Sequence, residues 1–147
     1  MLKVYRADIK DKDDVSVLFD QYRSFYKMPR DIISAKKFIN ERLVNKDSFI
    51  FLAKDSEIAC GFIQVYPAFS SVAMRPIWIL NDLFVNQQHR KKGCAKALMD
   101  CVKSEAKKNR VFSVKLATAI DNSKAKRLYE SLNYKKIDSF DNYSLKI

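Results

Sequence analysis

The chain has 147 residues, of which 48% are hydrophobic and 31% are charged. These values fit one globular domain over residues 1–147 and exclude a disordered or fibrous chain. No apolar run is long enough to cross a membrane, and the first residues, MLKVYRADIKD, lack the apolar core of a signal peptide. The three cysteines, Cys60, Cys94 and Cys101, form no C-x-x-C pair, so we expect a reduced, cytoplasmic protein without a membrane partner.

The formal net charge is +11, and most of the excess lies in the second half of the chain. Residues 1–83 hold 13 Lys and Arg against 11 Asp and Glu, whereas residues 84–147 hold 15 against 6. Such a field would steer a polyanionic ligand toward its site. A basic face also serves nucleic-acid binding, and a solvated lysine-rich surface has the same composition, so charge alone leaves three interpretations open.

Hydrophobic spacing and turn residues predict the elements in chain order. They are a strand at Leu2–Ala7, helices at Lys12–Tyr26 and Ser34–Val44, strands at Ser48–Lys54, Ile58–Tyr66 and Pro76–Val85, a helix at Gly93–Lys108, a strand at Phe112–Ala119, a helix at Ser123–Leu132, and two last strands at Tyr134–Ile137 and Tyr143–Ile147. The order β-α-α-β-β-β-α-β-α-β-β describes an α/β (α+β) fold, with a mixed, mostly antiparallel seven-stranded sheet and about four helices. The helix at Gly93–Lys108 would cross between two parallel strands.

The most informative stretch is WILNDLFVNQQHRKKGCAKALM, which runs from Trp78 to Met99. A strand rich in aromatic and branched residues leads into a polar loop with three consecutive cations, and a glycine then opens a helix with one apolar face. The first turn of a helix leaves backbone N–H groups unpaired and favours negative charge. Because ligands collect at the carboxyl ends of parallel strands, we expect a phosphate or pyrophosphate site between Val85 and Gly93.

The basic loop reads Arg90-Lys91-Lys92-Gly93-Cys94-Ala95. It lacks the lysine and hydroxyl residue that end a nucleoside-triphosphate loop, and it lacks the glycines of the dinucleotide fingerprint. It resembles the R-x-x-G-x-G/A signature of the GNAT family of N-acetyltransferases. A later segment, NSKAKRLYESLNY at Asn122–Tyr134, resembles the family's N-x-x-A-x-x-L-Y-E-x-x-G-F segment. Asn133 replaces its glycine, and asparagine tolerates a left-handed conformation. The element order is that of the family's acyl-coenzyme A acyltransferase fold, and the resemblance covers essentially the whole chain.

The resemblance implies acetyl-coenzyme A as the cosubstrate. In the family the basic loop cradles the pyrophosphate, and a tyrosine beside the sulfur protonates the departing thiolate. The implied cofactor-binding residues are Leu83, Phe84, Val85, Arg90, Lys91, Lys92, Gly93, Cys94, Ala95, Asn122 and Tyr129. From spacing alone, Asn122 also fits a helix N-cap and Tyr129 also fits a core position. No metal is expected, because one histidine and scattered cysteines give no metal-ligand spacing.

Acetyl transfer from a thioester to an amine needs a donor for the carbonyl oxygen, a base for the amine and an acid for the thiolate. By resemblance the donor is a strand amide near Val85, and the acid is Tyr129. Many relatives carry Glu-Asp where this chain has Asn81-Asp82. Asn81 cannot take a proton, so Asp82 is the nearer candidate base, directly or through water. A carboxylate that caps loop amides is the alternative role of Asp82.

The resemblance makes the acceptor a primary amine of a small molecule or peptide. In the family it is bound by the first two helices, their connection and the loop after the third strand. The candidate substrate-binding residues are Tyr26, Tyr66, Phe69, Asn81 and Asp82, with Tyr22 and Ser70 nearby. Aromatic faces suit a cationic amine, although such residues are also ordinary core and rim residues. Dimers are common in the family, so a homodimer is one expectation.

Two other functional classes compete with an N-acetyltransferase. A non-catalytic acyl-coenzyme A-binding module of the same fold would keep the basic loop without needing Tyr129, so the presence of Tyr129 favours the enzyme. A nucleic-acid-binding protein would interleave aromatic residues with its cations; the run Arg90 to Lys92 has none, so no nucleic-acid partner is expected. A nucleophilic Cys94 would depend on His89 in a polar loop, and a small packing residue in the helix is the simpler interpretation.

Overall fold

The computed structural model describes residues 1–147. The chain forms two compact units, residues 1–117 and residues 118–147. The larger unit holds the whole sheet and the first three α-helices, and the smaller unit holds the fourth α-helix. The single domain expected over residues 1–147 stays a prediction.

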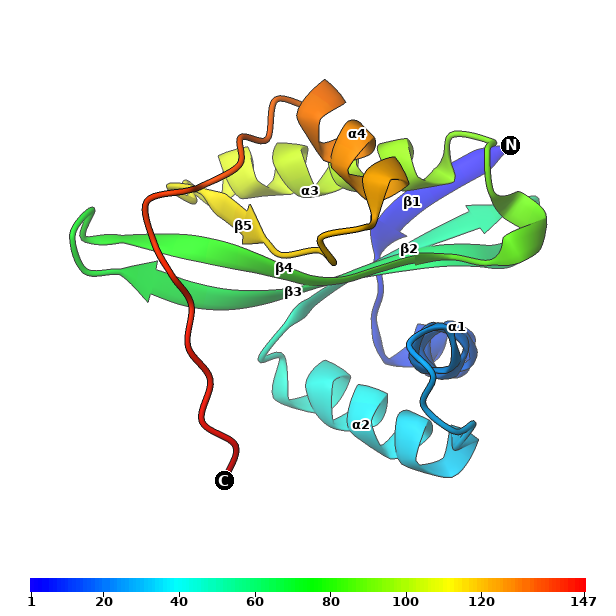
Figure 1. The fold of residues 1–147 in the computed structure, drawn as a ribbon. Coiled ribbons are helices and arrows are strands. Elements are labelled where there is room, and N and C mark those ends of the chain that lie inside the picture. Colours follow the sequence, from blue (N-terminus) through cyan, green and yellow to red (C-terminus); the bar gives the residue numbers. More distant parts are fainter. The chain divides into compact units, whose positions relative to one another are not determined.

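The larger unit is built on a five-stranded sheet (Figure 1). Its strands lie in the order β1 (Leu2–Arg6), β2 (Phe49–Asp55), β3 (Ile58–Ser70), β4 (Arg75–Val85) and β5 (Val114–Leu116). The first three pairings are antiparallel, and β4 and β5 are parallel. The mixed, mostly antiparallel sheet and its single parallel crossover are therefore confirmed.

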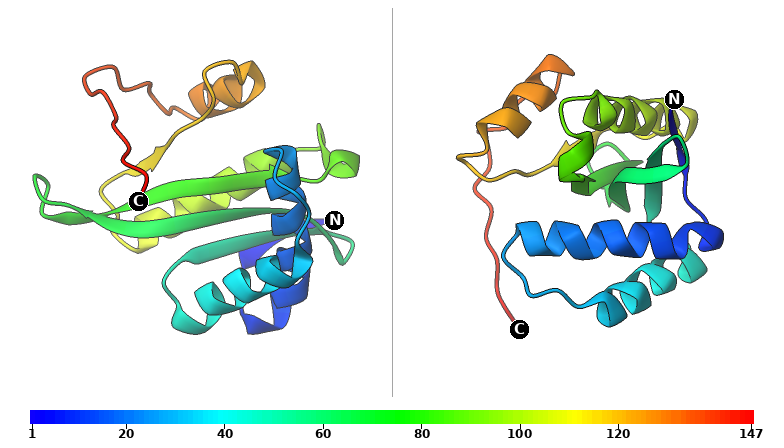
Figure 2. Two further views of the ribbon diagram at one scale, coloured as in Figure 1. Left: turned by 60° about the horizontal axis from the view of Figure 1, so that its bottom comes forward. Right: turned by 90° about the vertical axis from the view of Figure 1, so that its right-hand side faces the viewer.

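Helices cover both faces of this sheet. The helices α1 (Lys12–Phe25) and α2 (Ile32–Asn45) lie on one side, and α3 (Cys94–Lys108) lies on the other (Figure 2). One core layer lies between α1, α2 and the sheet, and its members include Val15, Leu18, Ile39, Leu52 and Phe62. On the opposite face α3 buries Leu98, Met99 and Val102. Because both faces are covered, β2 and β3 are apolar almost throughout.

A buried carboxylate fixes the connection between α1 and α2. Asp20 of α1 is 1% exposed. Its side chain accepts a hydrogen bond from the Asp31 N–H at 2.8 Å, and it pairs with the Arg30 guanidinium. Asp31 in turn caps α2, because its carboxylate accepts from the Ser34 N–H at 3.1 Å. The helix consequently starts at Ile32, two residues before the start predicted at Ser34.

Two strands of the larger unit differ in length from the prediction. β3 continues to Ser70 although the sequence predicted a loop from Pro67, because Pro67–Ser70 pair with Arg75–Trp78 across a long hairpin. Proline has no N–H, so local sequence favoured a loop there. β5 covers only Val114–Leu116 of the strand predicted at Phe112–Ala119, although Trp78 still donates to the Ser113 carbonyl at 3.0 Å.

The smaller unit holds α4 (Ser123–Ser131), which ends one residue before the predicted end. The prediction of two last strands at Tyr134–Ile137 and Tyr143–Ile147 is wrong, and the sheet has five strands rather than seven. A strand exists only when its backbone groups pair with a neighbour, and residues 132–147 have no such pairing. Ile137, Tyr143 and Leu145 are exposed, so their alternation with polar residues did not indicate a buried face.

Candidate functional site

The sheet opens at the carboxyl end of β4. β5 pairs with β4 only over Trp78–Leu80, whereas β3 continues to pair with β4 as far as Val85. Beyond Leu80, one edge of β4 therefore has no strand beside it, and its backbone N–H and C=O groups face that side. The predicted cofactor-binding residues Leu83, Phe84 and Val85 lie on this last part of β4.

The loop that follows β4 leads directly into the N-terminus of α3. A short 3-10 helix, η2 (Gln87–His89), begins the loop, and the Asn86 side chain caps it by accepting from the His89 N–H at 3.2 Å. Gly93 has a φ of +80°, and a Cβ there would meet no atom within 4 Å. Glycine is therefore needed for its left-handed conformation rather than to avoid a clash with the protein.

The first turn of α3 is suited to an anion. The first bond of the helix runs from the Ala97 N–H to the Gly93 carbonyl at 3.0 Å, so the N–H groups of Cys94, Ala95 and Lys96 have no partner within the helix. No acidic residue lies in this turn. The neighbouring Lys91 and Lys92 are exposed, and a helix of this length directs its positive end toward the loop.

Arg90 has a different role from its two neighbouring lysines. Its Nε donates to the Val85 carbonyl at 3.0 Å. Its guanidinium lies 5.5 Å from the centre of the Phe25 ring and 5.8 Å from that of Phe84. Arg90 thus ties the loop to the end of β4 and to the end of α1, a connection that the motif alone did not indicate.

Asp82 is the centre of a buried polar network on the α1 face of the sheet. It is 3% exposed, and it accepts hydrogen bonds from Gln64 Nε2 at 2.8 Å and from Asn81 Nδ2 at 3.0 Å. The Tyr22 hydroxyl also hydrogen-bonds to it. Behind Gln64, Ser48 Oγ donates to Gln64 Oε1 at 3.0 Å.

The surroundings of Asp82 change the acidity of several groups. Burial raises the pKa of Asp82, and the hydrogen bonds from Gln64, Tyr22 and Asn81 oppose this rise. Burial and the nearby Asp82 charge raise the pKa of Tyr22, and the same two causes raise the pKa of Tyr66 to about 12. Both tyrosines therefore stay protonated near neutral pH and can donate hydrogen bonds.

A register shift between β3 and β4 places the Asp82 side chain in the protein interior and the Asn81 side chain in solvent. Gln64 is opposite Asp82, but the next residue, Val65, is opposite Leu80, so Asn81 is an extra residue in β4. Such a bulge re-aims side chains; Asn81 is exposed and Asp82 is buried. The sequence did not single out Gln64 or Ser48. The available signal was one polar residue in the apolar strand IACGFIQVY.

The predicted acceptor residues lie at different places on the larger unit. Tyr26 is exposed at the end of α1, and its ring lies 5.0 Å from that of Tyr22. Tyr66 is close enough to Asp82 to feel its charge. Phe69 is 82% exposed and lies toward the tip of the β3–β4 hairpin, opposite Pro76. Tyr22, Tyr26 and Tyr66 therefore gather around the network, and Phe69 does not.

Cys94 is a buried packing residue. Its Sγ lies 3.5 Å from that of Cys60, and burial raises its pKa to about 12. A Cβ added at Gly61 would come within 3.1 Å of the same sulfur and 2.8 Å of the Phe84 carbonyl. His89 Nδ1 is instead 2.6 Å from the Asn86 side-chain oxygen. These contacts support the packing interpretation and not a nucleophile.

Two predicted site residues belong to the smaller unit. The Asn122 side chain accepts a hydrogen bond from the Ala125 N–H at 3.3 Å, so it caps the N-terminus of α4. This is the role that sequence spacing alone suggested for it. The Tyr129 ring lies 6.1 Å from that of Tyr134. The expected role of Tyr129 beside the coenzyme A sulfur stays a prediction.

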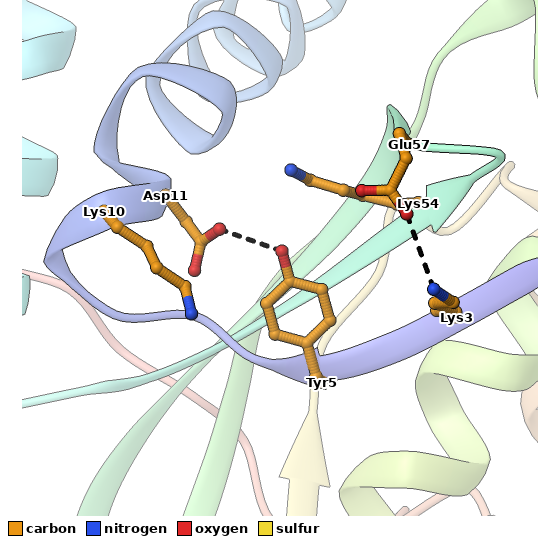
Figure 3. Close-up of a pocket in the computed structure, with 6 residues that line it drawn as sticks. All are labelled: Lys3, Tyr5, Lys10, Asp11, Lys54 and Glu57. Atoms are coloured by element: carbon orange, nitrogen blue, oxygen red, sulfur yellow. Dashed lines mark hydrogen bonds and ion pairs between the residues drawn. The ribbon is translucent and has the colours of Figure 1, made fainter.

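A cavity of about 470 Å³ lies elsewhere, at the edge strand β1 (Figure 3). It is lined by Lys3, Tyr5, Lys10, Asp11, Lys54 and Glu57. Each of its lysines is paired, Lys3 with Glu57, Lys10 with Asp8 and Lys54 with Asp14, so their charge is compensated and the cavity lacks the character of an anion site. The structure has no cluster of three or more potential metal ligands, and no helix long and apolar enough to span a membrane.

Known proteins resemble this chain over nearly its whole length. The model of the acetyltransferase (GNAT) family matches residues 15–134. An uncharacterized N-acetyltransferase of Bacillus subtilis (strain 168), YhfO, is 38% identical over 146 residues, which is 99% of this chain and 98% of that protein. The crystal structure of a probable acetyltransferase is 35% identical, with a TM-score of 0.93 over 99% of this chain and 97% of that one. The aminoglycoside N-acetyltransferase AAC(6')-Iy, in complex with CoA, shares the fold at 16% identity, with a TM-score of 0.82 over 100% of this chain and 96% of that one.

Proposed function

The chain belongs to the GNAT family of acetyltransferases, and from this premise we propose that it transfers the acetyl group of acetyl-coenzyme A to a primary amine of a small molecule or peptide. The observation that carries the proposal is the open end of β4 beside the unpaired first turn of α3. The open edge of β4 offers backbone groups to an extended chain, and the first turn of α3 with its loop offers N–H groups and cations to phosphates.

The cofactor half of the site is assigned to residues 83–95. We place the pantetheine arm along the free edge of β4 at Leu83, Phe84 and Val85. The pyrophosphate lies over the loop that ends at Gly93, where the N–H groups of Cys94 and Ala95 and the exposed Lys91 and Lys92 offer donors and positive charge. Asn122 and Tyr129 join this half by family resemblance.

The reaction proceeds by direct attack while both substrates are bound. The amine nitrogen forms a bond to the acetyl carbon, the carbonyl oxygen becomes negative, and a backbone N–H near Val85 stabilises it. The carbon–sulfur bond then breaks. Tyr129 gives its proton to the thiolate, and Asp82 takes, directly or through one water, the proton that the amine must lose before it can attack.

The acceptor half is assigned to the surroundings of Asp82. Tyr22 and Tyr66 lie beside the carboxylate, Tyr26 extends this aromatic surface toward solvent, and Asn81 is exposed next to it. Aromatic faces beside a carboxylate favour a cationic amine. A cytoplasmic location and a homodimer belong to the same proposal.

Two measurements test the proposed function. Calorimetric titration with acetyl-coenzyme A should give saturable binding, and duplex DNA at the same concentration should give none. A screen of primary amines, with thiol release as the readout, should then find an acceptor that depends on the protein. Binding of acetyl-coenzyme A with no thiol release for any amine would instead favour the non-catalytic module.

A further inference from the structure

The carboxylate of Asp82 is held by neutral groups only. The groups that face it are Tyr22 from α1, Gln64 and Tyr66 from β3, and Asn81 from β4. None of them is a cation. A buried carboxylate is ordinarily compensated by a positive charge of the protein. The protein supplies none to Asp82, so its negative charge is available to pair with a cationic ligand.

The chemistry of the bonds fixes the orientation of Gln64. An ionised carboxylate only accepts hydrogen bonds, so the Nε2 group of Gln64 must face Asp82 and its Oε1 must face away. Ser48 Oγ donates to that Oε1 at 3.0 Å. The Asp82 carboxylate thus sets the orientation of the amide, and the Ser48 hydroxyl satisfies the amide oxygen and holds the side chain in place. Gln64 itself is completely buried and lies directly opposite Asp82 in the β3–β4 pairing.

On the basis of the proposed function, we propose that Gln64, held in place by Ser48, is the positioning residue that holds the Asp82 carboxylate ready to receive a proton of the acceptor amine. A neutral amide fixes the carboxylate without neutralising it. A lysine or arginine at position 64 would compensate the charge, weaken the base and repel a protonated amine. The acceptor is accordingly a primary amine that binds as an ammonium ion and passes one proton to Asp82 before attack. The second proton, which the nitrogen loses once its bond to the acetyl carbon has formed, replaces through water the proton that Tyr129 gives to the thiolate.

The variant Gln64→Met tests this role, because it keeps an unbranched side chain of similar length and removes the donor. Loss of one hydrogen bond to the charged form raises the pKa of Asp82. The acid limb of the kcat/KM profile should therefore move to higher pH by about one unit, and kcat at pH 7 should fall roughly tenfold. The KM for acetyl-coenzyme A should stay unchanged.

Three further variants separate positioning from packing. Gln64→Glu keeps the volume but sets a second carboxylate against Asp82, so its acid limb should move further than that of Gln64→Met. Ser48→Ala leaves the Gln64 donor in place, so it should shift the acid limb of the kcat/KM profile less than Gln64→Met does. Val65→Ala is the packing control, because it removes buried volume at the next residue of β3. It should lower the melting temperature without moving the acid limb of the kcat/KM profile. All variants should bind coenzyme A as the unmodified protein does.

Carbon-13 NMR titration of the Asp82 carboxyl group makes the test independent of turnover. An unchanged Asp82 titration and an unmoved acid limb in folded Gln64→Met and Gln64→Glu would overturn the inference. If the unmodified protein transfers no acetyl group to any amine, the proposed function fails. A raised Asp82 titration in Gln64→Met would in that case still establish the hydrogen-bond contact, and only the catalytic purpose would be lost.

Discussion

At the scale of single residues, Arg90 shows how contacts refine a motif. From the motif, the three cations of the loop look equivalent. In the structure, Arg90 Nε donates a hydrogen bond to the Val85 carbonyl, and the guanidinium lies near the Phe25 and Phe84 rings. A planar guanidinium makes both contacts at once, and a lysine ammonium cannot. Arg90 therefore serves the order of the loop, and the exposed Lys91 and Lys92 supply charge.

This division predicts the outcome of Arg90→Lys. The exchange keeps the charge but loses the carbonyl bond and the ring contacts, so the affinity for acetyl-coenzyme A should fall about fivefold, close to the loss caused by Arg90→Ala. Calorimetric titration of both variants gives the comparison. Lys103→Arg, on an exposed part of α3, is the matched control for a charge-conserving exchange. Full recovery of affinity by lysine at position 90 would mean that Arg90 binds phosphate as a simple charge.

Cys94 gives a second prediction at this scale. Burial raises its pKa to about 12, so the thiol is protonated and unreactive near neutral pH. Cys94→Ala keeps the backbone N–H of the first helical turn, and we expect thiol release within about threefold of the unmodified rate. Iodoacetamide should modify Cys94 in urea and leave it unmodified in the native protein, as read by mass spectrometry. A loss of activity of roughly hundredfold or more would restore the nucleophile hypothesis.

At the scale of elements, Asp20 links the end of α1 to the start of α2. Burial acts to raise the pKa of Asp20, but the Asp31 N–H and the Arg30 guanidinium outweigh it and hold the pKa below its ordinary value. A carboxylate whose pKa is depressed by folding stabilises the protein above its unfolded pKa of about 3.9. That stabilisation is lost as the pH falls through the lower pKa of the folded state.

Asp20→Asn should therefore destabilise the protein in a pH-dependent way. At pH 7 the free energy of unfolding should fall by about 2 kcal/mol, because a charge-assisted bond to Arg30 is lost. The difference from the unmodified protein should shrink as the pH falls below about 3.9, because the unfolded chain then takes up a proton, and it should vanish once the pH passes below the depressed pKa of Asp20 in the folded state. Urea unfolding at several pH values measures it. Asp13→Asn, an exposed carboxylate on α1, should change little, and a pH-independent difference for Asp20→Asn would contradict this account.

The elements also show what local sequence could and could not predict. The β4–loop–α3 segment was predicted closely, because its aromatic strand, its glycine and its helical spacing are all local signals. The two last strands were not, because pairing with a distant neighbour decides whether alternating residues form a strand. The contact of Gln64 with Asp82 depends on the register of β3 against β4, which the hairpin length alone did not give. The sequence placed Gly93 at the start of this helix, and its left-handed φ supplies the physical reason for a glycine there.

At the scale of the whole molecule, the question is whether the positive charge acts locally or as a general field. Residues 84–147 hold 15 cations and 6 anions, and these cations include the loop lysines and exposed lysines further along α3. A general field would attract coenzyme A wherever the charge lay, and it would weaken steeply with salt. A local site would depend on the few cations beside the unpaired N–H groups of α3.

Two double variants with the same loss of charge decide between these cases. Lys91→Ala with Lys92→Ala removes two cations from the loop, and Lys103→Ala with Lys107→Ala removes two exposed cations from the C-terminal half of α3. The loop variant should bind acetyl-coenzyme A about tenfold or more weakly, whereas the α3 variant should lose less than about threefold. Calorimetric titration at low and at high salt measures both. Only the loop variant should show a reduced dependence of affinity on salt, because only it removes charges that we propose to contact phosphate. Equal losses in the two variants would show that the charge acts as a field, and the pyrophosphate would then have to be placed elsewhere than the Gly93 loop.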